Sequence, residues 1–512
     1  MGRIDRTFRI VPASVVALAT LLAGCATALP SLEGRAPTTA LTDTAGARLG
    51  RVLEPVVAAH PGKTGVHPLL KPRDAFATRA LLAAVAEKSL DVQYYIWHGD
   101  PVGYLLFEAL WQAAERGVRV RLLLDDNNTG GLDPTLAALD AHPNVEVRLY
   151  NPFLQRSGRI FGYLGDFQRL NRRMHNKSFT ADNQATIVGG RNIGDEYFEA
   201  RPDIEFADLD LLAIGPVVSE VSRQFDAYWN SPLAFPIAAL SQDRPSDEAI
   251  RQARAALREF VLAQKESSYA QALKSSGLAE GLVEGSLAFN FAKVRVVADD
   301  PMKILKESTD DSTRLLPKLL PEFESLDSEL LLVSPYFVPG DAGVDRLRSL
   351  VKRGVKVRVL TNSLASTDVL AVYAGYKRYR RALLEAGVEL YELKPTAAQT
   401  VKHDRPSGSR DDEAKPSLAG SSHASLHAKT MAFDRRALFV GSMNLDPRSV
   451  FTNTEIGVVV ENPRLATAMA EKLDELLPGL GFRLKLAPAA SPDSAPGIAW
   501  VARQDGKEIR YA

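Results

Sequence analysis

The sequence has a single cysteine and no net charge, and each scarcity excludes a class of protein. Among 512 residues only Cys25 is a cysteine, so internal disulfides and cysteine-based zinc or iron–sulfur clusters are excluded. Lys and Arg together number 62, as do Asp and Glu, which argues against nucleic-acid binding through overall positive charge. Hydrophobic residues make up 46% and charged residues 24%, so the chain is neither disordered throughout nor collagen-like.

The apolar run near the N-terminus is too short to span a membrane comfortably. It covers residues 11–22, follows several arginines and has the length of a signal-peptide core. It ends in Leu22-Ala23-Gly24-Cys25, which resembles the bacterial lipobox, and this implies a signal peptide over 1–24 and a lipidated Cys25. We therefore expect a lipid-anchored, periplasm-facing envelope protein. Ala26 favours the outer membrane; an uncleaved inner-membrane anchor and an incidental cysteine are the alternatives.

The remaining chain carries an internal repeat of strands and helices. Three apolar, β-branched runs of the first half recur at nearly constant offsets in the second, pairing 89–97 with 331–338, 118–124 with 355–360, and 145–150 with 388–393. Gly117 and Gly354 stand where a helix C-cap is expected before the second strand of each set. Strands alternating with helical patterns predict an α/β fold on a parallel or mixed sheet.

Composition divides the chain into six segments. We expect a signal peptide (1–24), an N-terminal linker (25–64), a first half (65–234), a helical insertion or linker (235–290), a second half (291–480) and a C-terminal tail patterned as a hairpin (481–512). Within the insertion, Ser246 is a suitable N-cap for a helix over 247–263.

Two matched motifs carry the chemistry. Residues 175–192 and 427–444 each hold His-x-Lys, an Asp seven residues after the His and an Asn seventeen after it, giving His175, Lys177, Asp182 and Asn192, then His427, Lys429, Asp434 and Asn444. The pair resembles the HxKxxxxD signature of the phospholipase D superfamily, present twice. The resemblance spans roughly residues 65–480 and implies two α-β-α sandwich halves related by a pseudo-twofold axis.

The spacing of these residues is consistent with a phosphate site. His and Lys two residues apart on a strand point to the same face. The second strand of each motif then ends at Gly189-Gly190 or Gly441-Ser442, where small residues allow close approach of a ligand. Bringing the halves together would gather two His, two Lys and two Asn as donors for phosphate oxygens, with Ser442 as a further donor. No metal or other cofactor is required by this set.

The resemblance implies covalent catalysis. A neutral histidine attacks phosphorus, and a protonated one donates to the leaving alkoxide and then deprotonates the acceptor. In the family the histidine of the N-terminal half is usually the nucleophile, so we assign this part to His175 and the acid/base part to His427; the reverse assignment stays open. The two must hold different protonation states at one pH.

Each histidine also needs a carboxylate to fix its tautomer. Glu455 begins a strand 28 residues after His427, and aligning 454–463 with 207–216 places Asp208 at the matching position, with Asp203 as its rival. The motif Asp182 and Asp434 are grouped with the catalytic residues, but a structural pairing within each half is the better interpretation. Gly190 replaces Ser442 in the first motif and so lacks a hydroxyl, which predicts weaker phosphate contact there.

Further motifs resemble bacterial cardiolipin synthases of the phospholipase D type, particularly the C type. They are residues 93–97, 124–127, 299–301, 334–340 and 444–449. The resemblance implies joining of a phosphatidyl group to phosphatidylglycerol, with phosphatidylethanolamine or phosphatidylglycerol as donor, at a membrane reached through Cys25. The alternatives are a phospholipase D with water as acceptor, a periplasmic phosphodiesterase or nuclease, and a non-catalytic envelope lipoprotein. Neutral charge and the lipid anchor argue against nucleic acid as a partner.

Two other stretches have competing interpretations. Residues 153–173 interleave arginines with aromatics directly before His175, which is typical of a segment on an anionic bilayer but also of a core helix with solvated arginines. Asp125-Asp126-Asn127-Asn128 could mimic an acidic metal site, although a capped turn after a strand is the better interpretation.

Overall fold

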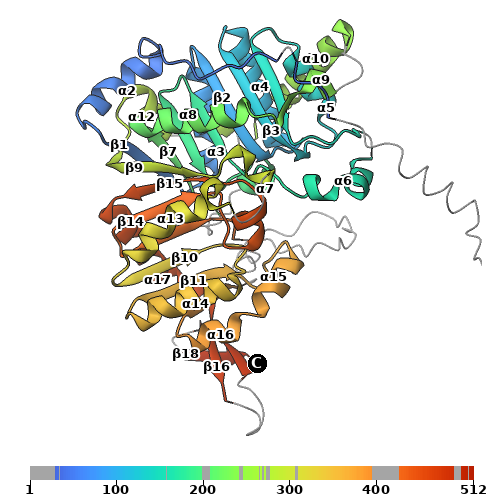
Figure 1. Ribbon diagram of the computed structural model, residues 1–512. Coiled ribbons are helices and arrows are strands. Elements are labelled where there is room, and N and C mark those ends of the chain that lie inside the picture. The colour runs from blue at the N-terminus through green and yellow to red at the C-terminus, as the bar shows by residue number, and fades with distance from the viewer. Residues whose placement is uncertain are drawn as a thin grey trace, which may run out of the picture.

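A computed structural model describes most of the chain as two halves stacked on each other (Figure 1). The described residues are 29–33, 35–156, 158–198, 208–240, 246–264, 266–267, 270–271, 277–305, 310–394, 426–488, 497–504 and 507–511. The proposed signal peptide with Cys25, and Asp203, lie outside these ranges. No helix in the described part of the chain combines the length and apolarity needed to cross a bilayer.

The first half is built on a mixed sheet with the order β8-β4-β3-β2-β5-β6-β7-β1. β2, β3 and β4 run parallel and the other pairs antiparallel. The strands are β1 (Thr64–Leu69), β2 (Ser89–Ile96), β3 (Arg119–Asn128), β4 (Val145–Tyr150), β5 (Ser178–Ala181), β6 (Ala185–Gly189), β7 (Asp210–Ile214) and β8 (Ala234–Pro236).

The second half repeats this order as β16-β12-β11-β10-β13-β14-β15-β9. Its strands are β9 (Asn290–Ala298), β10 (Glu329–Val333), β11 (Lys356–Asn362), β12 (Glu389–Leu393), β13 (Thr430–Phe433), β14 (Ala437–Gly441), β15 (Ile456–Glu461) and β16 (Gly481–Ala487). The C-terminal hairpin, β17 (Gly497–Gln504) with β18 (Lys507–Tyr511), continues the sheet beyond β16. Residues after 480 therefore extend the second sheet instead of forming a separate tail.

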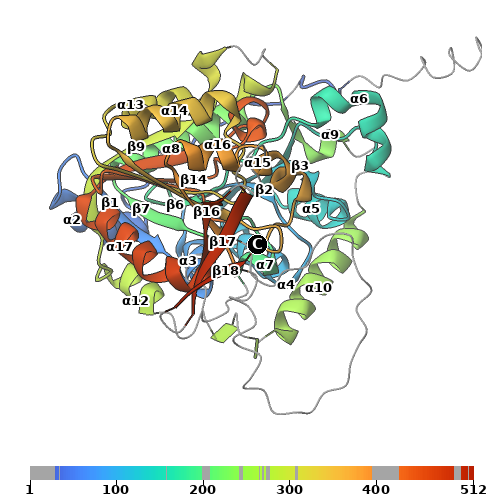
Figure 2. The same cartoon turned by 90° about the horizontal axis from the view of Figure 1, so that it is seen from below.

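Helices cover both faces of each sheet, as Figures 1 and 2 show. Alternation along the strands explains this: Leu122 and Leu124 of β3 join the core under one helical layer, while Leu123 between them packs on the opposite side. The helices of the first half are α2 (Arg48–Ala58), α3 (Pro72–Val85), α4 (Pro101–Glu115), α5 (Asp133–Asp140), α6 (Gly162–Leu170), α7 (Asp195–Phe198) and α8 (Pro216–Trp229). The α/β prediction is confirmed.

The second half has the corresponding layers. They are α13 (Leu315–Glu324), α14 (Gly340–Lys352), α15 (Leu370–Lys377), α16 (Arg380–Glu385) and α17 (Pro463–Leu480). Gly117 and Gly354, at φ 92° and 94°, connect α4 to β3 and α14 to β11 in a left-handed conformation that glycine adopts without strain. The C-cap prediction is confirmed at both positions.

The stretch between the halves is packed onto the first one. It contains α9 (Ile237–Leu240), α10 (Asp247–Ala263) and α12 (Gly277–Glu284). The Ser246 hydroxyl accepts a 3.2 Å hydrogen bond from the Ala249 amide, so the predicted cap of α10 is confirmed. α10 packs against α4 and α5, and β9 then pairs with both β1 and β15, joining the two sheets.

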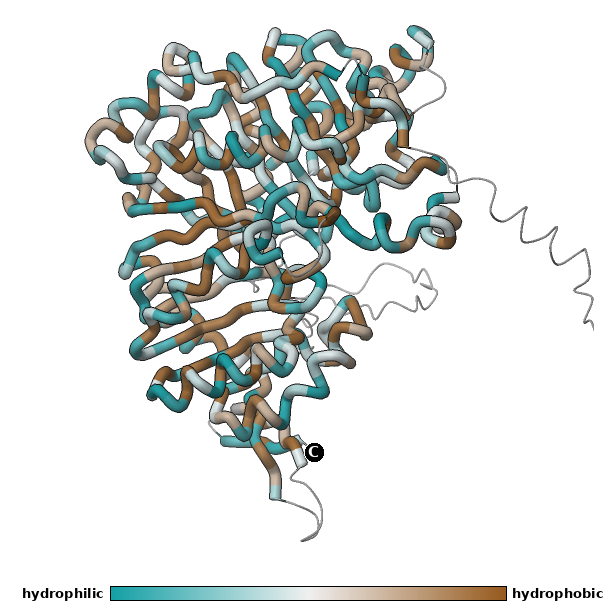
Figure 3. Tube along the Cα trace, viewed as in Figure 1, coloured by the Kyte–Doolittle hydropathy of each residue, from teal (hydrophilic) through white to brown (hydrophobic). Residues whose placement is uncertain are grey.

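An apolar cluster holds the halves together. Side chains of β6 and β7 meet those of β14 and β15 in one buried group, where Val188 and Leu211 lie with Val440 and Val458. The strands that meet here are largely brown in Figure 3, which marks their high hydropathy. At the edge of this contact Met174 bridges to Thr454, so the backbone just before His175 is bonded to the second half.

Candidate active site

The four motif His and Lys side chains are gathered in one buried region between the halves. His175 is 7% exposed, and Lys177 and Lys429 are each 1% exposed. The two His-x-Lys segments lie immediately before β5 and β13, not within these strands as the spacing predicted. At the first segment, the backbone at 174 bridges to Thr454 of the other half. Each lysine instead turns back: Lys177 Nζ donates to the His175 carbonyl at 2.6 Å, and Lys429 Nζ donates to the His427 carbonyl.

The two histidines are paired with carboxylates across the halves. His175 Nδ1 lies 2.7 Å from Glu455 Oε2, and His427 Nδ1 lies 2.5 Å from Asp208 Oδ2. This reciprocal exchange is the contact pattern that a twofold relation generates. With the Nδ1 proton directed at the carboxylate, Nε2 of each ring keeps its lone pair for another partner.

Backbone contacts fix the His175–Glu455 pair. The His175 amide donates to the Thr454 carbonyl at 2.8 Å, and the Thr454 amide donates back to the Arg173 carbonyl at 2.9 Å. The Glu455 amide donates to Asp299 Oδ2 at 2.7 Å. Both members of the pair are thus held by the junction between the halves.

The hydroxyl of Ser442, a predicted phosphate donor, is bonded to Glu455 in this structure. Its hydroxyl donates to Glu455 Oε2 at 2.5 Å and accepts from the Ile456 amide at 3.0 Å, so it positions the carboxylate of His175. Gly190, its counterpart, has a different reason to lack a side chain: a Cβ there would collide with Asp208 Oδ1. The close approach of Asp208 therefore explains why position 190 has no side chain, and the weaker phosphate contact expected there stays a prediction.

Both motif asparagines are buried and carry polar atoms without a hydrogen bond of good geometry. Asn192 is fully buried, and its Oδ1 accepts from the Ile96 amide at 3.3 Å. Its Nδ2 makes no hydrogen bond of good geometry among the described residues, although the Tyr197 hydroxyl interacts with this amide. Asn444 is 3% exposed, and its Oδ1 likewise makes no such hydrogen bond within the described ranges. A buried amide donor without a well-formed hydrogen bond costs free energy unless a ligand satisfies it, so Asn192 fits a phosphate-binding role.

Asp182 and Asp434 do not reach the site, so grouping them with the catalytic residues was wrong. Asp182 accepts hydrogen bonds from the amides of residues 87–89, and Asp434 accepts from those of residues 327–329. Each begins a tight turn at positive φ, 50° and 51° respectively. They tie the β5–β6 and β13–β14 turns to the starts of β2 and β10, as the structural interpretation predicted.

Burial sets the ionisation of the four basic groups. Burial, together with the nearby charges of Lys177 and Lys429, lowers the pKa of His175 well below its ordinary value. Burial and Lys429 also lower the pKa of His427, but there Asp208 opposes the shift. Burial lowers the pKa of Lys177 to about 7 and that of Lys429 to about 8. A phosphodiester anion entering between the lysines would favour their charged forms.

The two carboxylates also differ in pKa. Burial alone would raise the pKa of Asp208, but the charge and hydrogen bond of His427, with Lys429, hold it well below its usual range. Burial raises the pKa of Glu455 to about 7, with Lys177 opposing. The His427–Asp208 pair therefore stabilises an imidazolium more strongly than the His175–Glu455 pair does.

Two tyrosines complete the walls of the site and were not predicted as site residues. The Tyr95 ring stands edge-on to His175 at 4.8 Å between centroids, and Tyr197 stands edge-on to His427 at 5.0 Å. Lys177 Nζ also lies 5.4 Å from the centre of the Tyr95 ring. Tyr95 falls in a predicted strand, but nothing in the linear sequence indicates that it faces His175.

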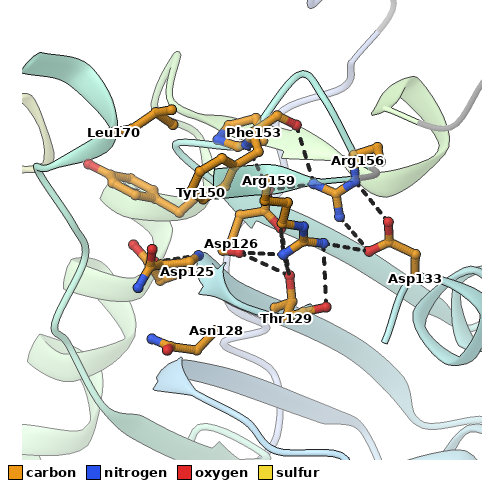
Figure 4. A network of polar contacts seen from close by, with 12 residues as sticks. Asp125, Asp126, Asn128, Thr129, Asp133, Tyr150, Phe153, Arg156, Arg159 and Leu170 are labelled. Carbon is orange, nitrogen blue, oxygen red and sulfur yellow. Dashed lines mark hydrogen bonds and ion pairs between the residues drawn. The ribbon is translucent and has the colours of Figure 1, made fainter. Parts of the chain in front are cut away.

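The acidic stretch after Leu124 forms an ion-pair network, not a turn and not a metal site. β3 continues to Asn128, and Asp125 receives Arg173 Nε at 2.8 Å and the Met174 amide at 2.8 Å. Asp126 is bound by Arg156 and Arg159, which also reach Asp133 (Figure 4). The turn lies at residues 130–131, after β3, and not at the four polar residues themselves. The capping part of the prediction is confirmed, because Asp125 accepts from the Asn127 amide at 2.9 Å and Asp126 accepts from the Thr129 hydroxyl at 2.6 Å.

The same network corrects one of the two interpretations of residues 153–173. The arginines point inward to carboxylates, and the side chains of Phe161, Leu164 and Phe167 are 60%, 85% and 59% exposed. The segment is therefore not a core helix with solvated arginines, and its contact with a bilayer stays a prediction.

One group of possible metal ligands occurs among the described residues. It consists of His98, Asp100 and Glu196, whose ligand atoms lie within 4.8 Å of one another. His98 Nδ1 is 3.2 Å from Glu196 Oε1, so the group is already joined by an ion pair at a partly exposed position. The expectation that the reaction needs no metal or other cofactor stays a prediction.

Comparison with known proteins agrees with the geometry. A family model described as "Cardiolipin synthase, PLD-like domain" matches residues 81–229 and 319–477, once in each half. Cardiolipin synthase C of Escherichia coli (strain K12) is 46% identical over 465 residues, 90% of this chain and 94% of that protein. The chain belongs to the cardiolipin synthase, PLD-like domain family.

Two more distant similarities were also found. Cardiolipin synthase A of Pseudomonas fluorescens is 25% identical over 392 residues, 76% of this chain and 63% of that protein. The crystal structure of phosphatidylserine synthase from Haemophilus influenzae Rd KW20 superposes with a TM-score of 0.52 at 13% identity, covering 86% of this chain and 92% of that one. This second likeness shows that the fold is shared.

Proposed function

We propose that this protein is a phosphatidyltransferase that makes cardiolipin from phosphatidylglycerol and a second phospholipid, phosphatidylethanolamine or phosphatidylglycerol. The observation that carries the proposal is the buried pair of crossed His–carboxylate contacts with a lysine beside each histidine. The 46% identity to cardiolipin synthase C supports the choice of substrates. A phosphodiester that carries a large group on each side of phosphorus suits a site formed between two equivalent halves.

His175 is the nucleophile in this proposal and His427 the acid/base. The support is electrostatic: the pKa of His175 is lowered further by burial and by both lysines, which keeps the imidazole neutral with a free Nε2 lone pair. Asp208, held ionised, opposes the lowering of the His427 pKa and so favours a proton on that ring.

The reaction proceeds in two displacements at phosphorus. Nε2 of His175 bonds to the phosphorus while the P–O bond to the first alcohol breaks, and His427 gives its proton to the departing alkoxide. His427 then takes a proton from the terminal hydroxyl of phosphatidylglycerol, whose oxygen attacks the phosphohistidine and frees His175. Ethanolamine or glycerol leaves in the first step, according to the donor.

The phosphate oxygens are held by four groups around the histidines. Lys177 and Lys429 supply charge-assisted hydrogen bonds, and Asn192 with Asn444 completes the set. The Nδ2 of Asn192, which makes no hydrogen bond of good geometry with the described residues, supports this assignment. All four groups are buried before substrate arrives, so they need no large reorganisation to stabilise negative charge in the transition state.

One assay of the products tests the proposal. Purified protein is incubated with phosphatidylglycerol, with and without phosphatidylethanolamine, and the lipids are separated by chromatography. Cardiolipin is the expected product. Phosphatidic acid would identify a hydrolase that uses water as acceptor, and absence of both products with cleavage of a nucleic acid would identify a nuclease. A variant with both His175 and His427 changed to Ala is the control for contaminating enzymes.

We further propose that the protein is anchored to the bacterial envelope through a lipidated Cys25, facing the periplasm, with the outer membrane favoured by Ala26. Arg35 supports a short tether, because its guanidinium donates to the carbonyls of Asn230, Ser231 and Ala234 in the first half. Ten residues from Cys25 to Arg35 span at most about 35 Å, which keeps the folded body near the bilayer.

Fractionation of a Cys25→Ser variant tests the anchor. We expect the variant to lose labelling by a radioactive fatty acid and to leave the membrane fraction. Retention of both labelling and membrane association would contradict the lipobox interpretation. The Ala26→Asp variant is the control for sorting: it keeps the lipid and is expected to move toward the inner membrane.

A further inference from the structure

A cavity of about 550 Å³ lies in the second half between α13, α14 and the one-turn helix η6 (Arg448–Thr452). Its volume is within the range of small-molecule sites, about 300–1,000 Å³. The side chains that define it are mainly apolar, including Leu316, Leu320, Val338 and Phe451. Such a lining favours a hydrocarbon ligand over a polar head group.

α13 divides its leucines between the core and this cavity. Leu315 and Leu319 are buried in the main core of the second half, at 1% and 0% exposure. Leu316 and Leu320, four residues apart on the neighbouring stripe of the helix, line the cavity and are only partly buried. The helix therefore has a second apolar stripe that the protein covers only in part, since Leu316 also packs against the edge of the core.

The equivalent aromatic residues of the two halves have different surroundings. Trp97 and Phe337 are equivalent, since each bridges to the residue after the motif asparagine, Ile193 in one half and Leu445 in the other. Both rings are buried, but Trp97 stacks on Phe107 at 4.5 Å, whereas Phe337 lies 6.1 Å from Tyr376 and borders the cavity. The two halves thus share a fold but pack differently at this position.

The cavity is connected to the site by two short paths. Leu445 and Asp446, which follow the phosphate-binding candidate Asn444, line it directly. At its other end the Leu315 amide donates to Asp299 Oδ1 at 2.6 Å, and Asp299 Oδ2 accepts from the Glu455 amide at 2.7 Å. A ligand held in the cavity therefore lies beside the groups that orient the catalytic centre.

Arg314 supplies an unused donor at this cavity. The residue is 8% exposed, its guanidinium pairs with Asp311 and stacks over Phe451 at 5.1 Å, and its Nε is buried without a hydrogen-bond partner among the described residues. An ester carbonyl oxygen at the end of an acyl chain would satisfy that N–H.

We propose that this cavity binds one acyl chain of the phospholipid substrate, with Arg314 Nε donating to its ester carbonyl. The inference rests on the proposed function for the identity of the lipid. It places the recognition of one acyl chain in the second half, beside Leu445 and Asp446. Each methylene buried in such a site improves binding about 4-fold.

Cavity-filling variants test this assignment. Leu320→Trp and Leu316→Trp place a large ring where the chain would lie, and Leu262→Trp makes the same change at an exposed leucine of α10. Phosphatidylglycerols of increasing chain length are used below the concentration at which they form micelles. We expect kcat/KM of the wild-type protein and of Leu262→Trp to rise with chain length. In the cavity variants, kcat/KM should fall at least about 10-fold for the lipid with the longest chain and stay unchanged for the deacylated head group.

A binding measurement separates this proposal from the proposed function. A phosphatidylglycerol with a fluorescent polyene chain reports burial of the chain without turnover. We expect the Kd to rise at least about 10-fold in Leu320→Trp, and to rise in Arg314→Gln, with thermal unfolding unchanged. An unchanged Kd in both variants, or no binding by the wild-type protein, overturns the acyl-chain site. If the wild-type protein binds the fluorescent lipid and the variants bind it more weakly, but no cardiolipin is made, only the proposed reaction is overturned.

Discussion

The difference between the two histidines can be tested by changing the leaving group. A phosphodiester of nitrophenol releases a phenolate that is stable without a proton, whereas a phospholipid releases an alkoxide that must be protonated. If His427 is the acid, His427→Ala should lose about 10²–10⁴-fold in lipid turnover, the range typical of general acid catalysis. The same variant should still release nitrophenol in a single burst, because His175 can attack without help.

The size of the effect at Asp208 follows from its contact with His427. The 2.5 Å bond joins a carboxylate to an imidazole that must hold a proton. A charge-assisted hydrogen bond contributes about 1.5–3 kcal/mol, which corresponds to about 1–2 pKa units. Asp208→Asn should therefore lower the pKa of His427 by this amount and reduce the protonated fraction at neutral pH about 10–100-fold. Lipid turnover should fall by the same factor, and the nitrophenol burst should not.

Rapid-quench measurement of the burst, followed by mass spectrometry of the modified peptide, provides the assay. The phosphoryl group should be found on His175 in both His427→Ala and Asp208→Asn, and His175→Ala should give no burst with either substrate. A burst in His175→Ala with the label on His427 would refute the assignment and support the reverse one. Equal loss on both substrates in Asp208→Asn would show that Asp208 acts on the fold of the site and not on the proton.

Three further predictions concern ionisation, stability and cofactors. Burial raises the folded-state pKa of Glu455 from its ordinary value of 4.5 to about 7, so the free energy of unfolding should decrease as pH rises from 4.5 to about 7. Glu455→Gln should therefore unfold at a higher temperature than wild type at pH 8 and at a similar temperature at pH 5. The same variant should lose activity. A difference that is independent of pH would contradict this. Asp434→Ala should lower the free energy of unfolding by about 1–3 kcal/mol in denaturant titration, because the amides of residues 327–329 lose their acceptor. Arg436→Ala nearby is the control. An unchanged midpoint would show that the turn is stable without the carboxylate. Chelation by EDTA should leave cardiolipin formation unchanged, and loss of activity restored by a divalent cation would show that a metal takes part.

The strands and the motif chemistry could be predicted because their signals are local. The apolar β-branched runs form β2, β3 and β4 and their counterparts, and the repeat places the two His-x-Lys motifs at equivalent positions. Aligning the strands after the motifs also brought out Asp208 and Glu455. The structure pairs both with histidines of the opposite half, which local sequence cannot indicate because it depends on how the halves dock.

Local sequence was insufficient where a residue's partners are distant in the chain. Ser442 has the type and place of a phosphate donor, yet in this structure its hydroxyl donates to Glu455, thirteen residues away. Asp125 and Asp126 have the composition of a turn, yet β3 continues to Asn128 and arginines of the next segment pair with both carboxylates. Ion pairs with residues distant in sequence also draw the arginines of residues 153–173 inward, which leaves apolar side chains of this segment exposed.

The crossed pairing also constrains how such a chain could have arisen and can now change. A protein with a single half would lack the carboxylate for its own histidine, so it would need a second copy and its activity would depend on concentration. Fusion of two copies removes that dependence and lets the two carboxylates diverge, as aspartate in one half and glutamate with an accompanying serine in the other. Gly190 lies in the same half as Asp208, and Ser442 in the same half as Glu455, so an exchange of halves between homologues keeps each carboxylate with its small residue. Such an exchange should therefore succeed only when the carboxylate of each half still reaches the histidine of the other.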